Sequence, residues 1–324
     1  MNLFIIGSGF TKALFPDAPL NRELLETLAR GAPDSASHKL INRYQTEDIE
    51  SALTKLDVDL ASHQPHLEQA GDELRELRHH IEKDLGSHFT SYRASNGLLS
   101  SSLWLSNFLD HAISEGDVAV SLNYDCVFEG VLDCRAKWSP NGGYGFLRHP
   151  LVSDGRAALS PVTVLKIHGS ASFRIAPCLN KPNSRAVSFV FDEWFFPRSA
   201  ENTHFGYGLG RGESYLIAPS YVKVPAVEIT YLMLDALKAS ARAKNLIIIG
   251  CGLRPEDAFL TLLLTEFLRQ PDWRNRRIAI LDPSAEAVSS RLKVYWGVDV
   301  SSCIVPIEGR LEDSVDQLLE TILK

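Results

Sequence analysis

The sequence predicts an open, mostly parallel α/β sheet with helices on both faces and one inserted helical subdomain. Short runs rich in β-branched residues recur along the chain between turn signals, which is the pattern of strands buried inside a parallel sheet. Two of these runs lead directly into glycine-rich turns, and two others end in polar side chains. A polar stretch with helical periodicity separates the first run from the second. This alternation of strands and helices predicts the α/β class.

Composition and charge narrow the class of protein. The chain has 324 residues, of which 45% are hydrophobic and 23% charged, as in an ordinary soluble globular protein of one large or two coupled domains. Its net charge is −7, and no basic block stands out, so we expect no direct grip on duplex nucleic acid. No apolar run approaches a membrane span, and no signal-peptide pattern precedes the first strand. These features predict a cytoplasmic protein that does not enter a membrane.

The chain opens on a strand, Asn2–Ile6, and a helix is predicted over 20–28. The turn that follows the strand consists of Gly7, Ser8, Gly9, Phe10 and Thr11. A strand, a glycine-rich turn and a helix start can form an anion cradle from backbone N–H groups. The turn lacks the third glycine of the usual dinucleotide fingerprint, so a plain tight turn is the alternative interpretation.

Residues 33–115 interrupt the α/β pattern and read as a helical insertion. Apolar residues recur at positions 49, 53, 56 and 60, on one face of a first helix, and at 67, 74, 77, 81 and 85 in a longer second helix. The charged face of the second helix is typical of a solvated surface, with a partner surface as the alternative. A third helix is predicted over roughly 101–113. The predicted organisation is therefore one domain, 1–32 with 116–324, interrupted by the insertion 33–115.

Polar side chains of catalytic type follow two buried strands. Asn123 and Asp125 come directly after the strand Val118–Leu122, and His168 follows the strand Val162–Ile167. Ligands of open α/β sheets bind at the carboxyl ends of the strands, so these side chains are candidates for chemistry. The alternatives are a simple turn at 123–125, a structural histidine, and a helix-capping role for Asp125.

Residues 136–161 and 171–225 are rich in glycine, proline, serine and asparagine and read as functional loops. Short strands are predicted inside them, at 187–191 and 215–217. The acidic-aromatic cluster 192–196 reads as a loop anchored in the core, with a substrate lid or an interface as the alternative. Lys223 is a candidate contact for a phosphate.

A complete βαβ unit lies near the C-terminus. The strand Asn245–Ile249 leads into the turn Gly250-Cys251-Gly252-Leu253, a helix is predicted over 255–268, and the next strand, 277–281, ends at Asp282. A carboxylate at that position can accept hydrogen bonds from a ribose diol. Asp282 is also placed to cap the following helix, and the two roles are compatible.

These four motifs, in this order, resemble the sirtuin-like family, and most closely its prokaryotic branch of NAD-hydrolysing domains in anti-phage defence systems. GSGFTKA stands at the glycine-rich opening of that family, LNYD at its Asn-Asp motif, IHGS at its His-Gly motif, and GCGLRPED at its late glycine motif. The resemblance covers roughly residues 1–310.

The resemblance implies a Rossmann-like fold, with the 33–115 insertion bordering an NAD cleft. It also implies an NAD+ glycohydrolase, which cleaves the nicotinamide–ribose bond of NAD+ to ADP-ribose and nicotinamide. Asn123, His168 and Asp125 are then the catalytic residues. The residues that would bind NAD+ are Gly7, Ser8, Gly9, Phe10, Thr11, Gly169, Gly250, Gly252, Leu253, Asp257 and Asp282.

The chain differs from the family's deacylases in its cysteine spacing and at Leu122. None of the five cysteines forms a CxxC pair, so the usual four-thiolate zinc site cannot be built, and we expect no metal. Leu122 stands where deacylases have glutamine. A protein deacylase is therefore the less favoured reading, and the main alternative is a non-catalytic NAD or ADP-ribose sensor or scaffold subunit. A hydrolase of a central cofactor must be restrained, which implies a homo-oligomer, a sensor, or an ATPase- or nuclease-type partner chain.

Overall fold

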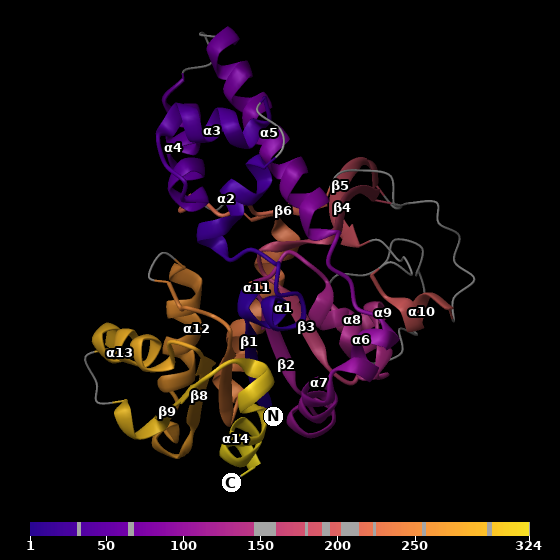
Figure 1. Cartoon of the computed structure of the whole chain (residues 1–324), viewed down its shortest axis with the longest axis vertical. Helices are drawn as coiled ribbons and strands as arrows, with labels where there is room; N and C mark the ends of the chain where they lie inside the picture. Colours follow the sequence, from indigo (N-terminus) through magenta and orange to yellow (C-terminus); the bar gives the residue numbers. More distant parts are fainter. Residues whose placement is uncertain are drawn as a thin grey trace.

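The main sheet has six parallel strands in the order β3-β2-β1-β7-β8-β9 (Figure 1). The structure is a computed structural model that describes residues 1–30, 34–63, 68–145, 160–178, 181–189, 195–201, 214–222, 225–254, 257–296 and 300–323. The strands are β1 Asn2–Ile6, β2 Val118–Ser121, β3 Thr163–Lys166, β7 Asn245–Ile249, β8 Arg277–Asp282 and β9 Ile304–Glu308. The predicted fold class is confirmed, and the strand order is that of a doubly wound dinucleotide-binding sheet.

The central strands form because they can be buried on both faces. Residues 3–6 of β1 and 246–249 of β7 are fully buried and pair in register, with Phe4 opposite Ile247. Such continuous apolar runs are stable only between two layers of helices. Their bounds match the sequence prediction, whereas β2 and β3 each differ from it by one residue at one or both ends.

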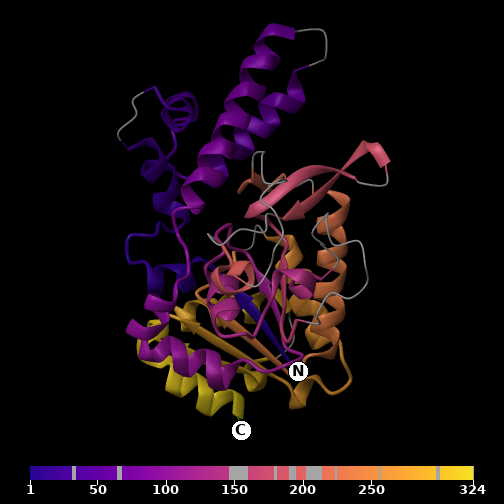
Figure 2. The ribbon, with the colours of Figure 1, turned by 90° about the vertical axis from the view of Figure 1, so that its right-hand side faces the viewer.

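Helices cover both faces of this sheet (Figure 2). α11 packs against β2 and β3 and against its neighbour α12, while α14 packs against β8, β9, α7 and η1. The helices of these layers are α1 Ser8–Leu14, α7 Leu103–Asn107, η1 Phe108–Ala112, α8 Val127–Cys134, α11 Val227–Arg242, α12 Ala258–Leu268, α13 Ala285–Trp296 and α14 Leu311–Leu323. Shorter elements are α6 Asn96–Ser101, α9 Pro140–Gly143, α10 Pro197–Glu201, η2 Trp273–Asn275 and η3 Ser301–Cys303.

A helical group projects from the sheet on the side away from both chain ends (Figures 1 and 2). It comprises α2 Asn21–Ala29, α3 Ala36–Tyr44, α4 Ile49–Ser62 and α5 Glu68–Phe89, which contact one another. This group of contacting helices spans 21–89, and it overlaps the predicted insertion 33–115, whose bounds stay a prediction. The stretch 96–112 instead packs with α8 and α14, because its apolar face is needed to cover the sheet.

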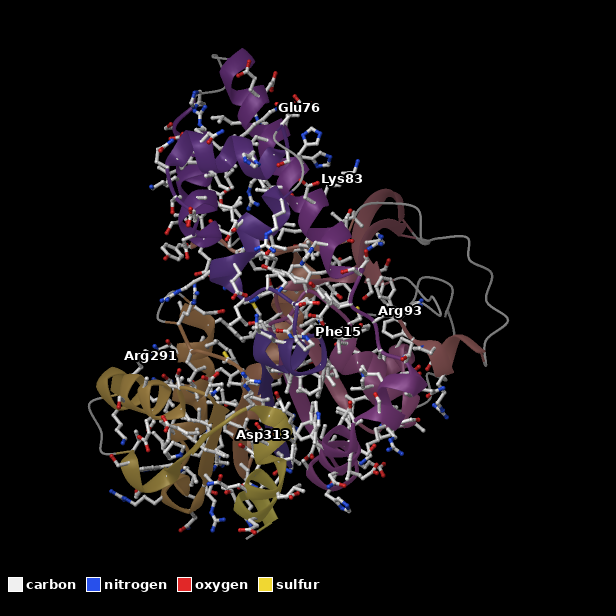
Figure 3. All side chains as sticks on the ribbon, viewed as in Figure 1. Phe15, Glu76, Lys83, Arg93, Arg291 and Asp313 are labelled. Carbon is white, nitrogen blue, oxygen red and sulfur yellow. The ribbon has the colours of Figure 1, made fainter. Side chains whose placement is uncertain are left out.

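The predicted solvated face of α5 is largely exposed, and Glu76 and Lys83 lie along its outer side (Figure 3). Arg78 is the exception, because it turns toward α4 and pairs with Asp57 at 2.8 Å. That ion pair joins the two longest helices of the projecting group.

A second, antiparallel sheet occupies part of the stretch that the sequence predicts as loops. Its strands are β4 Gly169–Cys178, β5 Lys181–Phe189 and β6 Ser214–Leu216, in the order β5-β4-β6. β4 was not predicted, although Ala171, Phe173 and Ile175 alternate with two serines and Arg174; within the sheet Arg174 donates to Ser214 at 3.0 Å. The sheet packs against α5 and places β4 directly after His168.

The aromatic end of the 192–196 cluster supports the core-anchor reading, since Phe195 and Phe196 are buried and Phe196 stacks near Trp138 with ring centroids 5.1 Å apart. Residues 192–194 and Lys223 lie outside the described residues. None of the helices that the structure describes has the length and hydropathy of a membrane span.

Candidate functional site

A cavity of about 950 Å³ lies at the carboxyl ends of β1 and β7, where the strand order reverses. Open α/β sheets bind their ligands at this switch point, and the volume is at the upper end of the usual ~300–1,000 Å³ range for small-molecule sites. Its walls come from the turns after β1, β2, β7 and β8, from the segment after β3, and from α2 and α4 of the helical group. All four sequence motifs therefore meet in one place.

The two glycine turns interlock at the floor of the cavity. The Gly7 N–H donates to the Ile249 carbonyl and the Gly9 N–H to the Gly250 carbonyl, each at 3.0 Å. Gly250 has φ +56°, and a Cβ there would lie 2.5 Å from the Gly9 Cα. A side chain would force the turns apart, which is why the motif needs glycine at this position.

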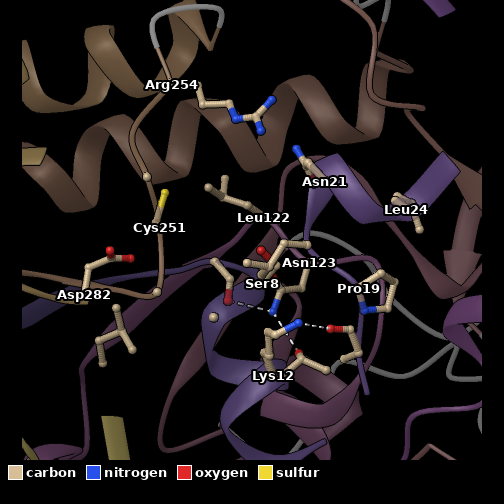
Figure 4. Close-up of a pocket in the computed structure, with 18 of the residues that line it drawn as sticks. Ser8, Lys12, Pro19, Asn21, Leu24, Leu122, Asn123, Cys251, Arg254 and Asp282 are labelled. Carbon is tan, nitrogen blue, oxygen red and sulfur yellow. Dashed lines mark hydrogen bonds between the residues drawn. The ribbon is translucent and has the colours of Figure 1, made fainter. Parts of the chain in front are cut away.

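Asn123 is fixed by both hydrogens of its amide. Its Nδ2 donates to the Gly7 carbonyl at 3.0 Å and to Thr11 Oγ1 at 3.1 Å, and the Thr11 hydroxyl donates to Asp125 Oδ2 at 2.8 Å. Figure 4 shows this amide above the start of α1, in the middle of the pocket lining. Because both donors are engaged, only the Asn123 carbonyl oxygen remains for a ligand, and it can only accept.

Asp125 is linked to Asn123 through the Thr11 hydroxyl. It is buried, and its Oδ1 accepts from the Val127 N–H at 3.0 Å, at the start of α8. The predicted turn is therefore present together with the contact to Thr11, but the N-cap of α8 is Cys126 and not Asp125. Burial raises the pKa of Asp125, while the Lys166 ammonium and the hydrogen bonds from Val127 and Thr11 oppose that rise.

Lys166 contacts the segment that carries Asn123 and Asp125. Its Nζ lies 3.1 Å from Glu129 Oε1, both side chains are fully buried, and it also donates to the Asp125 backbone carbonyl. Burial raises the pKa of Glu129, and the Lys166 charge opposes it. No sequence pattern indicates this ion pair, because lysine side chains are almost never fully buried unless they are paired.

His168 lines the cavity and lies against a carboxylate. Its Nε2 is 3.1 Å from Asp257 Oδ2, and the two side chains are only 10% and 12% exposed. Asp257 is also the N-cap of α12. Asp257 was predicted to bind the nucleotide; it lines the cavity and also contacts the imidazole of His168.

Sequence reasoning missed a set of polar residues that span the cavity. Arg254, in the turn after β7, pairs with Glu50 of α4, and Glu50 also accepts from Asn21 Nδ2 at 2.8 Å. Figure 4 shows Arg254 and Asn21 extending into the pocket from separate elements. No local pattern marks these residues, because each belongs to a different segment and only the packing of the helical group joins them.

Asp282 stands at the far end of the lining, beside the second glycine turn (Figure 4). Its Oδ1 accepts from the Ser284 N–H at 2.8 Å in the turn before α13, and its carboxylate faces the cavity. Arg291 reaches the same end from α13 and donates to the Gly252 carbonyl at 2.7 Å.

Two predicted binding residues do not line the cavity. Phe10 is fully buried against Phe108 and Phe128, because α1 turns this side chain into the core. Gly169 has φ +76°, and a Cβ there would lie 2.4 Å from the Tyr215 carbonyl oxygen. The lack of a side chain at position 169 lets β4 approach β6 closely. The other predicted binding residues, Gly7, Ser8, Gly9, Thr11, Gly250, Gly252, Leu253, Asp257 and Asp282, do line it.

Within the described part of the chain, no three His, Cys, Asp or Glu side chains are grouped as metal ligands would be. Cys251 lines the cavity, but burial raises the pKa of its thiol to about 12. A thiol of that kind is protonated at neutral pH and is a poor nucleophile.

Comparison with known proteins gives a structural likeness only. No protein-family model and no curated protein matches the chain. Solved Sir2 structures align with 99% of it: a Sir2 homologue mutant bound to ADP-ribose (14% identity, 92% of that chain, TM-score 0.41) and a Sir2 homologue–NAD complex (12% identity, 89% of that chain, TM-score 0.39). Sir2Tm bound to a propionylated peptide aligns at 10% identity over 92% of its length, with a TM-score of 0.39. At this level of similarity, the fold assignment rests on the strand order and register described above.

Proposed function

We propose that this protein is an NAD+ glycohydrolase, which hydrolyses the bond between nicotinamide and ribose. One observation carries the proposal: two interlocked glycine turns, Asn123 and His168 line one cavity at the switch point of a doubly wound sheet. Such a site suits a dinucleotide. The motif resemblance to NAD-hydrolysing sirtuin-like domains supports the same substrate.

To cleave this bond, the protein must mainly position the substrate and stabilise the charge that develops on the ribose. Nicotinamide leaves a pyridinium as a neutral molecule, so the C1′–N bond breaks through an oxocarbenium-like transition state, as in other glycoside cleavages. Water then adds to the anomeric carbon, and the products are ADP-ribose, nicotinamide and one proton. An oxygen acceptor beside that carbon stabilises the developing positive charge and orients the water.

Asn123 and His168 can divide these tasks. The Asn123 carbonyl oxygen is the acceptor, because both of its amide hydrogens are bonded to the protein. His168 is the general base for the water or a ribose hydroxyl, a role suited to imidazole near neutral pH. Asp125 acts through Thr11 to hold the Asn123 amide in this orientation.

The direct test is incubation of the purified chain with NAD+ and separation of the products by chromatography. We expect nicotinamide and ADP-ribose in equal amounts, and a fall of cellular NAD+ when the chain is expressed in an active state. NAD+ binding without turnover, both in the isolated chain and in cells, would instead favour the sensor or scaffold function.

We expect the unaltered chain to prefer NAD+ to NADP+. Asp282 accepts hydrogen bonds from a ribose diol and repels a 2′-phosphate. Removal of that charge by Asp282→Ala should narrow the preference by roughly tenfold or more. The measurement is kcat/KM for both dinucleotides, with the exposed carboxylate variant Asp110→Ala as control. Equal use of NAD+ and NADP+ by the unaltered chain would leave Asp282 only its role in the turn.

The biological setting follows from the same proposal. An enzyme that depletes NAD+ harms its own cell unless it is restrained, so we propose a defence effector that is switched on by self-assembly or by a separate sensor, ATPase- or nuclease-type chain. The support is the motif resemblance to domains of anti-phage systems. Turnover measured with and without candidate partners tests this setting separately from the chemistry.

A further inference from the structure

We propose that Asp257 is a positioning residue for His168, holding the imidazole in one orientation and one tautomer for the hydrolysis. This inference rests on the proposed function for its catalytic part. It differs from a nucleotide-binding role for Asp257, because the carboxylate faces a protein side chain. The two residues come from separate segments, the turn between β3 and β4 and the N-cap of α12, and only the fold joins them.

The contact itself sets the tautomer. Asp257 Oδ2 lies 3.1 Å from His168 Nε2, within hydrogen-bond distance. An ionised carboxylate can only accept, so Nε2 carries the hydrogen and the lone pair of the neutral ring is on Nδ1. Both side chains are almost completely shielded from solvent, and such shielding strengthens a charged hydrogen bond.

Each partner is held independently of the other. The Asp257 carboxylate accepts from the Leu260 N–H at 3.4 Å as the N-cap of α12, and its backbone N–H donates to the Arg254 carbonyl at 3.1 Å. The backbone of His168 is fixed by the Ile217 N–H, which donates to its carbonyl at 2.9 Å. The pair is therefore preorganised by the ends of two elements rather than by a loose loop.

Other charged groups around this part of the cavity are already engaged. Glu50 of α4 pairs with Arg254, and Asp125 accepts hydrogen bonds from Thr11 and Val127. Of these acids, Asp257 is the one in hydrogen-bond contact with the ring of His168. When His168 takes a proton from water or a ribose hydroxyl, the Asp257 carboxylate stabilises the resulting imidazolium, as the buried aspartate does in a Ser-His-Asp triad.

The test variant is Asp257→Asn. Asparagine is an equally good N-cap, so the helix start is preserved, but its amide donates to Nε2 and imposes the opposite tautomer. We expect kcat to fall by about 10²–10⁴-fold with KM little changed, since the corresponding triad change costs about 10⁴. We also expect the acid limb of the pH–rate profile to move to lower pH, because the imidazolium loses its counter-charge.

Asp48→Asn is the matched control, because Asp48 caps α4 through the Ser51 N–H and does not line the cavity. It reports what the same change at an N-cap costs in stability alone, and we expect kcat and the pH profile to be unchanged. A rate and pH profile of the unaltered chain retained in Asp257→Asn would overturn the proposal.

A second readout does not depend on turnover. Nitrogen-15 NMR of histidine-labelled protein distinguishes Nε2–H from Nδ1–H, and we expect the His168 signals to exchange these identities in Asp257→Asn. If the unaltered chain fails to hydrolyse NAD+ both in isolation and in cells, the glycohydrolase function fails, and this signal alone decides the positioning contact. An Nδ1–H tautomer in the unaltered chain would overturn the contact whatever the activity.

Discussion

We expect His168→Ala and Asn123→Ala each to lower NAD+ turnover by at least about 10²-fold, with the fold preserved. General base catalysis contributes about 10²–10⁴-fold, and an electrostatic acceptor aimed at the developing charge contributes 10²–10³-fold. Both side chains lie at the cavity wall rather than in the apolar core, so their loss leaves the packing of the sheet largely intact. Product formation measured by chromatography, with circular dichroism for folding, tests the expectation.

Two further variants sharpen this result. His111→Ala removes an exposed histidine of η1 that does not line the cavity, and it should leave turnover unchanged. Asn123→Asp places a carboxylate oxygen opposite the Gly7 carbonyl, where the amide now donates. Two acceptors cannot form a hydrogen bond, so Asn123→Asp should also lower NAD+ turnover although it is isosteric. Full activity in His168→Ala or Asn123→Ala would remove the catalytic role assigned to that residue.

The second large effect concerns stability. Lys166→Met should lower the free energy of unfolding by about 3–5 kcal/mol, because it leaves the buried carboxylate of Glu129 without its cation. In a chain of 324 residues, such a loss corresponds to a fall in Tm of roughly 5 °C. The Asp125 carbonyl also loses its donor, so the turn that carries Asn123 loosens and NAD+ binding weakens. Thermal and urea unfolding provide the measurement.

The stability that Lys166→Met loses should depend on pH in one direction. Burial already raises the pKa of Glu129, and loss of the lysine raises it further. A carboxyl group whose pKa is higher in the folded state stabilises the fold fully below its unfolded pKa, about 4.3, and loses that contribution as the pH rises through the folded pKa. The deficit of Lys166→Met should therefore be smaller near pH 5 than near pH 8.

The double variant Lys166→Met with Glu129→Gln is the control, because it removes both charges. Replacing a buried ion pair as a whole is often nearly neutral, whereas breaking it is costly. We expect the double variant to recover much of the lost stability. A single variant as stable as the unaltered chain at pH 8 would show that the Lys166–Glu129 contact carries no stabilisation.

Local sequence predicted the elements that form for local reasons. Asn2–Ile6 and Asn245–Ile249 were predicted with the observed bounds, because an uninterrupted apolar run between turn signals fits only a strand buried on both faces. The α4 and α5 helices followed from their apolar faces. Strands that depend on neighbours were not predicted: β9 carries Pro306, and β4 carries polar residues that find their partners across the second sheet.

The sequence by itself determined which residues can do chemistry at this site: Asn123 and His168 after their strands, and the glycine turns that follow β1 and β7. Only the tertiary structure decided what each of them contacts. It turned Phe10 into the core, joined Asp257 to His168, and brought Glu50 across the cavity to Arg254. The physical reason is the separation along the chain of the residues that interact. Strand and turn formation depend on neighbouring residues, whereas a hydrogen bond or ion pair between distant segments exists only once the sheet order brings the ends of those segments to the same edge.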